Sequence, residues 1–361
     1  MPEIAKALAE SGNAEYLYLA GRDWPDERFT PEIAQALVET RDAKYLYLAG
    51  KDWPNRRCCE AIAEALIATG NAEYLYLAGR DWPVGQQDGA IAKALVKALI
   101  EADNAHYLYL AGQNWSNELY SPAITQALIE RGDAEHLYLA GRDWPEGRFS
   151  EQIMYALAKT LHPYYLYRAG LEWPDERFGD AIACALAEAD NPWMLYCAGR
   201  DWLDARFSRV ITEALIAIGD VESLYHAGKD WPEGRYDNRI AQAFVEARFP
   251  KYLYLAGCHW PEGRFSAAFA QALAEVGDPE YLYLAGHDWP EGRFSKAIAQ
   301  GLAETKNAEY IYLAGKDWRS SRFDKVLAQA LVETGDENYI YLARKRWRNN
   351  KFDKVLGQAL T

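Results

Sequence analysis

Tryptophan recurs through this chain at a fixed interval. Successive members of the series are 29 residues apart, with a single interval of 33 residues between Trp82 and Trp115. The series consists of Trp24, Trp53, Trp82, Trp115, Trp144, Trp173, Trp202, Trp231, Trp260, Trp289, Trp318 and Trp347. A constant period in this range is typical of a solenoid, in which each short unit buries its apolar face only against its neighbours. We therefore expect residues 1–361 to form one continuous repeat array.

Each unit carries the signals of two short helices. Ser, Thr or Asp stands six residues after most of the tryptophans, and Asn or Asp stands eleven residues before most of them. These residue types cap helices by accepting from a free backbone N–H, and the proline that often follows the tryptophan ends the second helix. Apolar residues recur at helical spacing, as at Leu17, Ala20, Gly21 and Trp24. The pattern predicts an all-α fold, an α-solenoid that forms a right-handed superhelix of about twelve antiparallel helical hairpins, in the TPR and HEAT class.

Three positions beside the tryptophan are nearly constant. Tyrosine six residues before it and alanine four before it occur in all twelve units, and glycine three before it fails only at Arg344. Glycine inside a helix costs about 1 kcal/mol relative to alanine, so we expect its small size to admit a neighbouring helix beside each indole. An acid and an arginine flank the turn, as at Asp23 and Arg28, and unit four replaces both, with Asn114 and Leu119. Their joint loss suggests an ion pair that braces the turn, within or between units.

Two stretches depart from the regular unit. The 33-residue interval places a four-residue excess around residues 92–99, which lengthens the first helix of that hairpin by about one turn. Residues 339–361 form the last unit, which we expect to be a polar cap of the array. Asp353 is its one acidic residue, and its basic residues are Arg344, Lys345, Arg346, Arg348, Lys351 and Lys354.

Composition and charge exclude several classes of protein. A net charge of −14 disfavours general binding to phosphate backbones or anionic lipid, which depends on an excess of Lys and Arg. No run of residues is apolar for the length of a membrane span, and the N-terminus lacks the features of a signal peptide. The five cysteines are odd in number and irregular in spacing, which argues against a disulfide framework. We expect a cytoplasmic protein that does not contact membranes.

The chain shows no motif of a known catalytic class. It lacks a glycine-rich phosphate loop, a nucleophile elbow, a zinc-protease motif and a dinucleotide fingerprint. Cysteine and histidine do occur in adjacent units, but successive helix layers are about 8–10 Å apart, whereas zinc ligands converge within about 2.0–2.3 Å of one ion. We therefore expect no metal, no cofactor and no enzymatic activity.

The string Gly-Arg-Asp-Trp-Pro-Glu-Gly-Arg-Phe at residues 141–149 resembles short tyrosine-rich repeats with a Gly-Arg-Trp-Pro core from phage and bacterial proteins. The capped hairpins also resemble the α-solenoid class of TPR, Sel1-like and HEAT repeats, although 29 residues is shorter than those units and their signature strings are absent. The likeness covers essentially the whole chain. It implies a helical repeat of phage or bacterial type and assigns no catalytic residue.

Comparison of the twelve units with one another exposes a candidate binding site. Residues nine, five and two positions before the tryptophan share one stripe of the second helix, and several units carry an acid, a leucine and a base there. Units six to nine change this pattern, and two of them lose the usual helix cap, at His162 and Phe249, where we expect the backbone to differ. The candidate stripe consists of Tyr164, Arg168, Leu171, Trp193, Cys197, Arg200, His226, Lys229, Cys258 and His259.

Two interpretations of the stripe remain open, a binding site on the inner surface of the array and a tolerated drift among repeats. Exposed aromatic and Arg residues favour the first, because they dominate interface hot spots. We expect a non-catalytic scaffold that binds a protein or peptide, in a setting of phage–host interference that the resemblance alone implies. The alternatives are nucleic-acid binding along a regularly spaced Arg/Lys and Tyr stripe, and an acidic mimic of DNA. Hydrolase or ring-closure chemistry is a further alternative. The sequence leaves the oligomeric state open.

Overall fold

A computed structural model describes residues 2–54, 57, 60–82, 89–203, 208–290, 292–293, 295–318 and 321–347. These residues form 24 α-helices and no strand, with each helix packed against its neighbours in sequence, so the expected all-α solenoid is confirmed. They divide into two compact units, Met1–Ala185 and Leu186–Thr361, whose boundary falls inside α13 (Asp180–Glu188). The expectation of one continuous array stays a prediction. No described helix has the length and apolar character needed to cross a bilayer.

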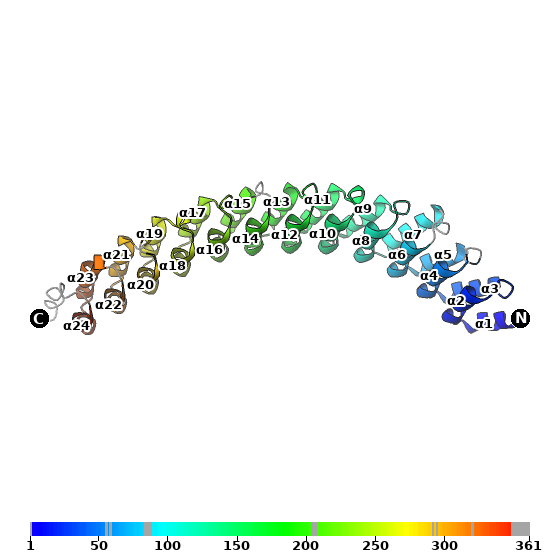
Figure 1. Cartoon of the computed structure of the whole chain (residues 1–361), viewed down its shortest axis with the longest axis horizontal. Coiled ribbons are helices and arrows are strands. Elements are labelled where there is room, and N and C mark those ends of the chain that lie inside the picture. The colour runs from blue at the N-terminus through cyan, green and yellow to red at the C-terminus, as the bar shows by residue number, and fades with distance from the viewer. Residues whose placement is uncertain are drawn as a thin grey trace. The chain divides into compact units, whose positions relative to one another are not determined.

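The first unit alternates two kinds of helix (Figure 1). Odd-numbered helices are the first helices of the hairpins, and even-numbered helices are the second. The first helices are α1 (Pro2–Ser11), α3 (Pro31–Thr40), α5 (Glu60–Thr69), α7 (Gly89–Glu101), α9 (Pro122–Arg131) and α11 (Glu151–Thr160). The second helices are α2 (Ala14–Asp23), α4 (Ala43–Asp52), α6 (Ala72–Asp81), α8 (Ala105–Asn114), α10 (Ala134–Asp143) and α12 (Pro163–Glu172).

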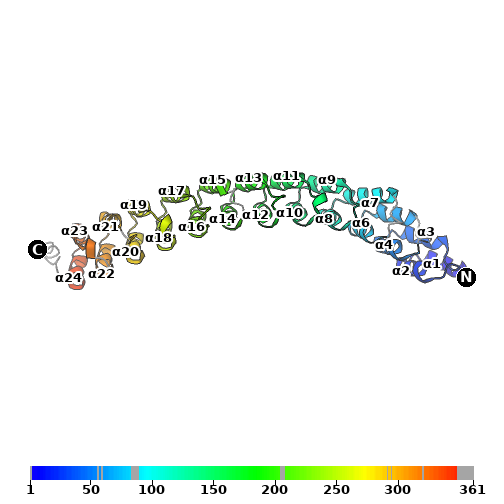
Figure 2. The same ribbon diagram turned by 45° about the horizontal axis from the view of Figure 1, so that its top comes forward.

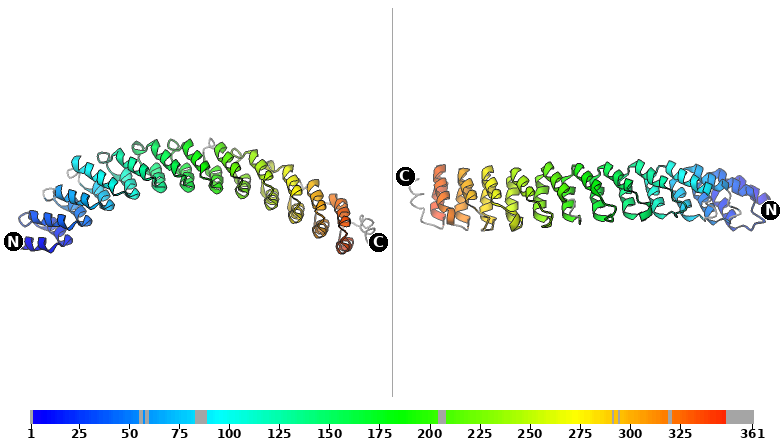
Figure 3. Two further views of the ribbon diagram at one scale, coloured as in Figure 1. Left: turned by 180° about the vertical axis from the view of Figure 1, so that it is seen from behind. Right: turned by 90° about the horizontal axis from the view of Figure 1, so that it is seen from above.

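The second unit continues the same alternation (Figure 2). After α13, its first helices are α15 (Ser208–Ile218), α17 (Asn238–Glu246), α19 (Ala267–Val276), α21 (Lys296–Glu304) and α23 (Asp324–Thr334). Its second helices are α14 (Pro192–Asp201), α16 (Val221–Asp230), α18 (Pro250–His259), α20 (Pro279–Asp288), α22 (Ala308–Asp317) and α24 (Glu337–Arg346). Within each unit, successive second helices pack side by side. They form one edge of the row and the first helices form the other (Figure 1), and the two rows of helices are seen from two further sides in Figure 3.

The helix boundaries follow the capping residues. Asn13 Oδ1 accepts a hydrogen bond from the backbone N–H of Tyr16 at 3.1 Å, and Ser150 Oγ accepts from Gln152 at 3.2 Å. Gly132, which ends α9, has a φ of +68°, a left-handed conformation that favours glycine. The predicted side-chain caps of the first helices are confirmed at Ser121, Ser150 and Asp237, whereas Thr30, Ser266 and Ser295 make no side-chain cap bond.

The two uncapped second helices have an ordinary backbone, so the expectation of a local difference was wrong. His162 and Phe249 make no side-chain cap bond, but their φ and ψ angles, −81° and 102° and −86° and 108°, match those of Asp42, −77° and 103°. Pro163 and Pro250 stand at the first helical position, where no backbone N–H needs an acceptor. Proline thus starts these helices without a side-chain cap.

Each indole packs against the preceding hairpin and is hydrogen-bonded to it. The Nε1–H of Trp144 donates to the backbone carbonyl of Tyr109 at 3.0 Å. Its six-membered ring lies against Gly112, where an added Cβ atom would overlap ring carbons. Only 2% of the surface of Trp144 is exposed to solvent. The tryptophan ladder therefore belongs to the core, and the constant glycine is required by the close approach of the ring.

The same contact repeats through both units. The glycine and tryptophan pairs are Gly21–Trp53, Gly50–Trp82, Gly79–Trp115, Gly112–Trp144, Gly141–Trp173, Gly199–Trp231, Gly228–Trp260, Gly257–Trp289, Gly286–Trp318 and Gly315–Trp347. In each pair the indole N–H also donates to the carbonyl of the tyrosine three residues before the glycine.

Among the described residues, the acid before the tryptophan and the arginine after it do not pair with each other, so the predicted ion pair between these two positions is wrong. Arg57 pairs instead with Asp26 of the preceding turn. The acid accepts from the constant tyrosine of the preceding hairpin, as in the 2.6 Å bond from Tyr18 Oη to Asp52 Oδ2. The arginine reaches carbonyls at the end of the preceding second helix, as in the 2.8 Å bond from Arg57 Nη1 to Gly21 O. Both residues therefore connect neighbouring hairpins, through different partners.

Arg148 shows why this arginine is structural. Its Nη1 donates to Gly112 O at 2.7 Å, and its Nη2 donates to Trp115 O at 2.6 Å. The guanidinium lies 4.6 Å from the centroid of the Tyr120 ring and is 8% exposed. The carbonyls at a helix C-terminus lack intrahelical partners and carry partial negative charge, so a buried cation satisfies both needs.

Replacing Arg148 with methionine should lower the free energy of unfolding by about 2–3 kcal/mol, because buried carbonyls lose charged hydrogen-bond donors. Arg28 occupies the same position of its repeat but is exposed and has no second helix before it among the described residues. Arg28→Met is therefore the control and should change stability by less than about 0.5 kcal/mol. Urea denaturation followed by circular dichroism measures both, and equal losses would contradict the assigned role.

The irregular stretches differ in how far they are described. α7 comprises 13 residues, whereas α5 and α9 comprise 10 each, so the long interval coincides with a long first helix. Arg344, Lys345 and Arg346 form the exposed end of α24. The rest of the expected C-terminal cap, residues 348–361, lies outside the described residues.

Candidate binding site

The candidate stripe lies on the second helices and is shared between the two units. Tyr164, Arg168 and Leu171 are on α12 of the first unit. The members on α14, α16 and α18 of the second unit are Trp193, Cys197, Arg200, His226, Lys229, Cys258 and His259. The stripe therefore consists of two separate groups of residues, one in each unit.

In the first unit, Arg168 is held by aromatic and acidic neighbours. Its guanidinium carbon is 5.9 Å from the ring centroid of Tyr138 and 5.7 Å from that of Tyr164, and its Nη1 donates to Tyr164 Oη at 3.0 Å. Its Nη2 also pairs with Glu172, one turn along α12. Tyr164 and Leu171 remain exposed on either side. The arginine therefore serves mainly to fix the aromatic surface.

Glu172 is the centre of this charged group. Burial alone would raise the pKa of its carboxyl, but hydrogen bonds from Tyr138 and Arg142, together with the charge of Arg168, leave the pKa lowered. Arg142 Nη1 stands 3.3 Å from Glu172 Oε2. Two arginines therefore share Glu172, while Arg142 also binds Asp143 at 2.7 Å. The charges of this group are balanced internally.

In the second unit, three rings form a compact group beside a carboxylate. The ring centroids of Trp193 and Tyr196 are 5.0 Å apart, and those of Tyr196 and His226 are 5.5 Å apart. Trp193 and His226 meet edge to face, with centroids 5.9 Å apart at 89°. Asp230 accepts from Tyr196 Oη at 2.9 Å and lies 3.5 Å from His226 Nδ1. We call Trp193, Tyr196, His226 and Asp230 the Trp193 cluster.

Ser223 explains why His226 can join these rings. In most hairpins a tyrosine occupies the corresponding position and packs on the constant tyrosine of the preceding hairpin. Tyr252 packs on Tyr225 in this way, with ring centroids 5.8 Å apart. Ser223 is buried and too small to cover Tyr196, and His226, which replaces the usual leucine one turn later, contacts that ring instead. The two substitutions are therefore coupled in space.

Sequence reasoning selected Trp193 and His226 but missed Tyr196, Asp230 and Ser223. Tyr196 is constant in the repeat and Asp230 is the usual acid of its position, so comparison of the repeats gives no signal for them. Ser223 does depart from the rule, and the same comparison could have found it.

The basic residues of the stripe have different partners. Arg200 binds both oxygens of Asp201, at 2.7 and 2.8 Å, and donates to Tyr196 Oη at 3.1 Å. Lys229 Nζ lies 4.0 Å from Asp230 Oδ1. Burial and the hydrogen bond to Asp230 raise the pKa of Tyr196, although Arg200 opposes that change. Tyr196 is therefore a neutral hydrogen-bond donor at physiological pH.

The remaining three members do not join the Trp193 cluster. Cys197 is only 7% exposed, and burial raises the pKa of its thiol. Burial also raises the pKa of Cys258. His259 replaces the usual acid and its Nδ1 lies 2.8 Å from Tyr225 Oη. Among the described residues, no group of three or more His, Cys, Asp or Glu side chains is placed to hold a metal ion.

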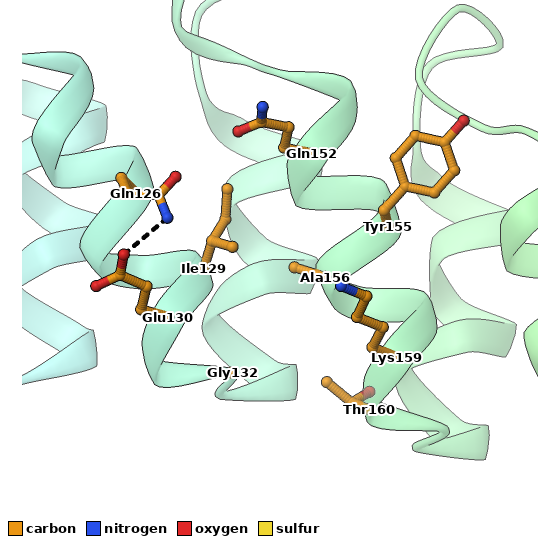
Figure 4. Close-up of a pocket in the computed structure, with 9 residues that line it drawn as sticks. All are labelled: Gln126, Ile129, Glu130, Gly132, Gln152, Tyr155, Ala156, Lys159 and Thr160. Carbon is orange, nitrogen blue, oxygen red and sulfur yellow. Dashed lines mark hydrogen bonds between the residues drawn. The ribbon is translucent and has the colours of Figure 1, made fainter.

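A groove lies between the first helices α9 and α11 (Figure 4). Its lining consists of Gln126, Ile129, Glu130, Gly132, Gln152, Tyr155, Ala156, Lys159 and Thr160. Gln126 Nε2 donates to Glu130 Oε1 at 2.8 Å, and the ring of Tyr155 is exposed. The groove lies on the opposite edge of the first unit from the second helices and contains no member of the candidate stripe.

Comparison with known proteins assigns neither the repeat type nor this site. No family model matches the chain, and no curated protein matches it.

Proposed function

We propose that this chain is a non-catalytic scaffold that binds a protein or peptide through the exposed face of its second helices, with Trp193 as the principal anchor. The exposure of Trp193 carries the proposal. Its side chain is 48% exposed at a position where ten of the twelve units have a charged or polar residue. A packed solenoid needs no indole at this position.

Trp193 has the properties of an interface anchor. Tryptophan is enriched among the few residues that supply most of the energy of an interface. Contacts with Tyr196 and His226 hold the ring in place before a partner arrives, which reduces the entropy lost on binding. A large, exposed and pre-ordered ring can therefore contribute strongly to affinity.

The neighbouring second helices can extend the contact surface. A leucine five residues before the tryptophan is partly exposed in most units, as at Leu255 and Leu284 on α18 and α20. An anchor flanked by partly exposed leucines suits a partner that presents several apolar groups.

Affinity purification of partners with Trp193→Ala tests the proposal. Tyr341→Ala is the control, because Tyr341 is another exposed aromatic residue of a second helix, at 58% exposure. We expect the partner retained by the parent protein to be retained by Tyr341→Ala and to bind Trp193→Ala at least about tenfold more weakly in a purified assay. Equal thermal stability of the variants establishes that both are folded. Unchanged binding by Trp193→Ala would rule out Trp193 as the anchor.

A further inference from the structure

The carboxylate of the Trp193 cluster lacks the bidentate arginine that neutralises four of its counterparts. In four other hairpins, the arginine before the acid binds both carboxylate oxygens. These pairs are Arg22–Asp23, Arg80–Asp81, Arg142–Asp143 and Arg200–Asp201, with distances of 2.6 to 3.0 Å. Before Asp230 the chain has Lys229, whose Nζ lies 4.0 Å away. Asp230 therefore lacks the bidentate arginine of those hairpins.

Asp230 can accept further hydrogen bonds. The hydroxyl of Tyr196 donates to its Oδ2, and His226 Nδ1 lies 3.5 Å from the same oxygen. An ionised carboxylate has roughly four acceptor positions on its two oxygens. The side chain of Asp230 is 31% exposed, so solvent reaches it beside the rings. A donor from a partner can therefore approach this carboxylate.

The exposed Trp193 indole contacts Tyr196 and His226, the same two residues that contact Asp230, and this arrangement favours a positively charged donor. The face of an aromatic ring attracts a cation, most strongly for tryptophan, and a nearby carboxylate adds direct charge attraction. The net charge of −14 also draws basic partners toward the chain as a whole. The negative charge of Asp230 would repel an acidic partner. Arg200 is not available to bind such a partner, because it already binds Asp201 and Tyr196.

We propose, building on the scaffold function above, that the Trp193 cluster binds a lysine or arginine side chain of the partner. The cation lies against the Trp193 indole, and Asp230 is its counter-ion. His226 and Ser223 make the site possible, because the small serine leaves room for the histidine to hold the rings together. The partner is thus a peptide segment that presents a basic residue next to apolar ones.

Tripeptides of the form acetyl-Gly-X-Gly-amide, with lysine, arginine, norleucine or glutamate at X, probe this site on the full chain. The indole N–H signal of Trp193, assigned with Trp193→Phe, reports binding in a nitrogen-15 NMR titration. We expect the lysine and arginine peptides to bind about fivefold more tightly than the norleucine peptide, and the glutamate peptide to bind most weakly. Asp230→Asn should remove this preference.

Asp317→Asn is the matched control. Asp317 holds the same repeat position, accepts from Tyr283 at 3.2 Å and has Lys316 3.4 Å away, but no exposed tryptophan stands beside it. It should keep the preference for lysine and arginine. Equal affinity for norleucine and lysine, or tightest binding of glutamate, would overturn the basic-partner proposal. If such results accompany loss of partner capture by Trp193→Ala, the scaffold proposal stands, whereas unaffected capture overturns the scaffold proposal itself.

Discussion

Replacing Gly141 with alanine is expected to destabilise the first unit by about 3 kcal/mol, although alanine is the better helix former. The added methyl group would overlap Cζ2 and Cε2 of Trp173, which lies on the next hairpin. The indole cannot simply withdraw, because its N–H is bonded to Tyr138 O at 2.9 Å and its surface is buried. The loss appears as a lower midpoint of urea denaturation.

Gly147→Ala is the control for this substitution. Gly147 lies in the short 3-10 helix Glu146–Arg148 between α10 and α11, and an added Cβ atom there would have no heavy atom within 4 Å. It should leave the midpoint nearly unchanged. A double variant with Gly141→Ala and Trp173→Phe should lose less than the sum of the two single variants, because a smaller ring leaves room for the methyl group. Similar midpoints for Gly141→Ala and Gly147→Ala would refute the steric role of the glycine.

Local signals in the sequence were sufficient to predict the hairpins. Capping residues, glycines with positive φ and prolines act within one or two turns of their own position, so their consequences can be derived without knowing the fold. The core position of the tryptophans also followed, because the apolar spacing of Leu17, Ala20, Gly21 and Trp24 defines one face of α2. These features depend on period and residue type alone.

Partners in the next hairpin could not be derived in the same way. Asp52 binds Tyr18, and Arg57 binds Gly21 O, across 34 and 36 residues. The sequence shows that the acid and the arginine are lost together, but two residues that each contact the preceding hairpin can vary together without touching each other. Only the distance between hairpins separates these two explanations.

The candidate stripe shows the same limit. Helical spacing placed Cys197 on one face with Trp193, yet the structure buries the thiol. The contact between His226 and Tyr196 depends on the small volume of Ser223, which is a property of packing between hairpins rather than of helical periodicity. Departures from the repeat identified the region, and side-chain volumes decided which residues meet.

The largest loss of stability is expected from Trp144→Ala. Removing a buried tryptophan costs about 3–5 kcal/mol through lost burial and the cavity that remains. Trp144 also donates to Tyr109 O, so Trp144→Phe, which keeps much of the apolar contact, should show an intermediate loss. Hydrogen exchange of the α8 and α10 amides measures the local effect, because repeat units are stabilised mainly by their neighbours.

Trp24 provides the control that separates the role of the indole between hairpins from its role within one. It has the same place in the repeat, but the described residues contain no earlier second helix to supply the glycine and the tyrosine carbonyl, and its side chain is partly exposed. Trp24→Ala should therefore cost less than about 1 kcal/mol. If Trp24→Ala and Trp144→Ala are equally destabilising, the indole acts inside its own hairpin. A much larger loss for Trp144→Ala means that the indole stabilises the contact between neighbouring hairpins, so the stability of each hairpin depends on the hairpin next to it.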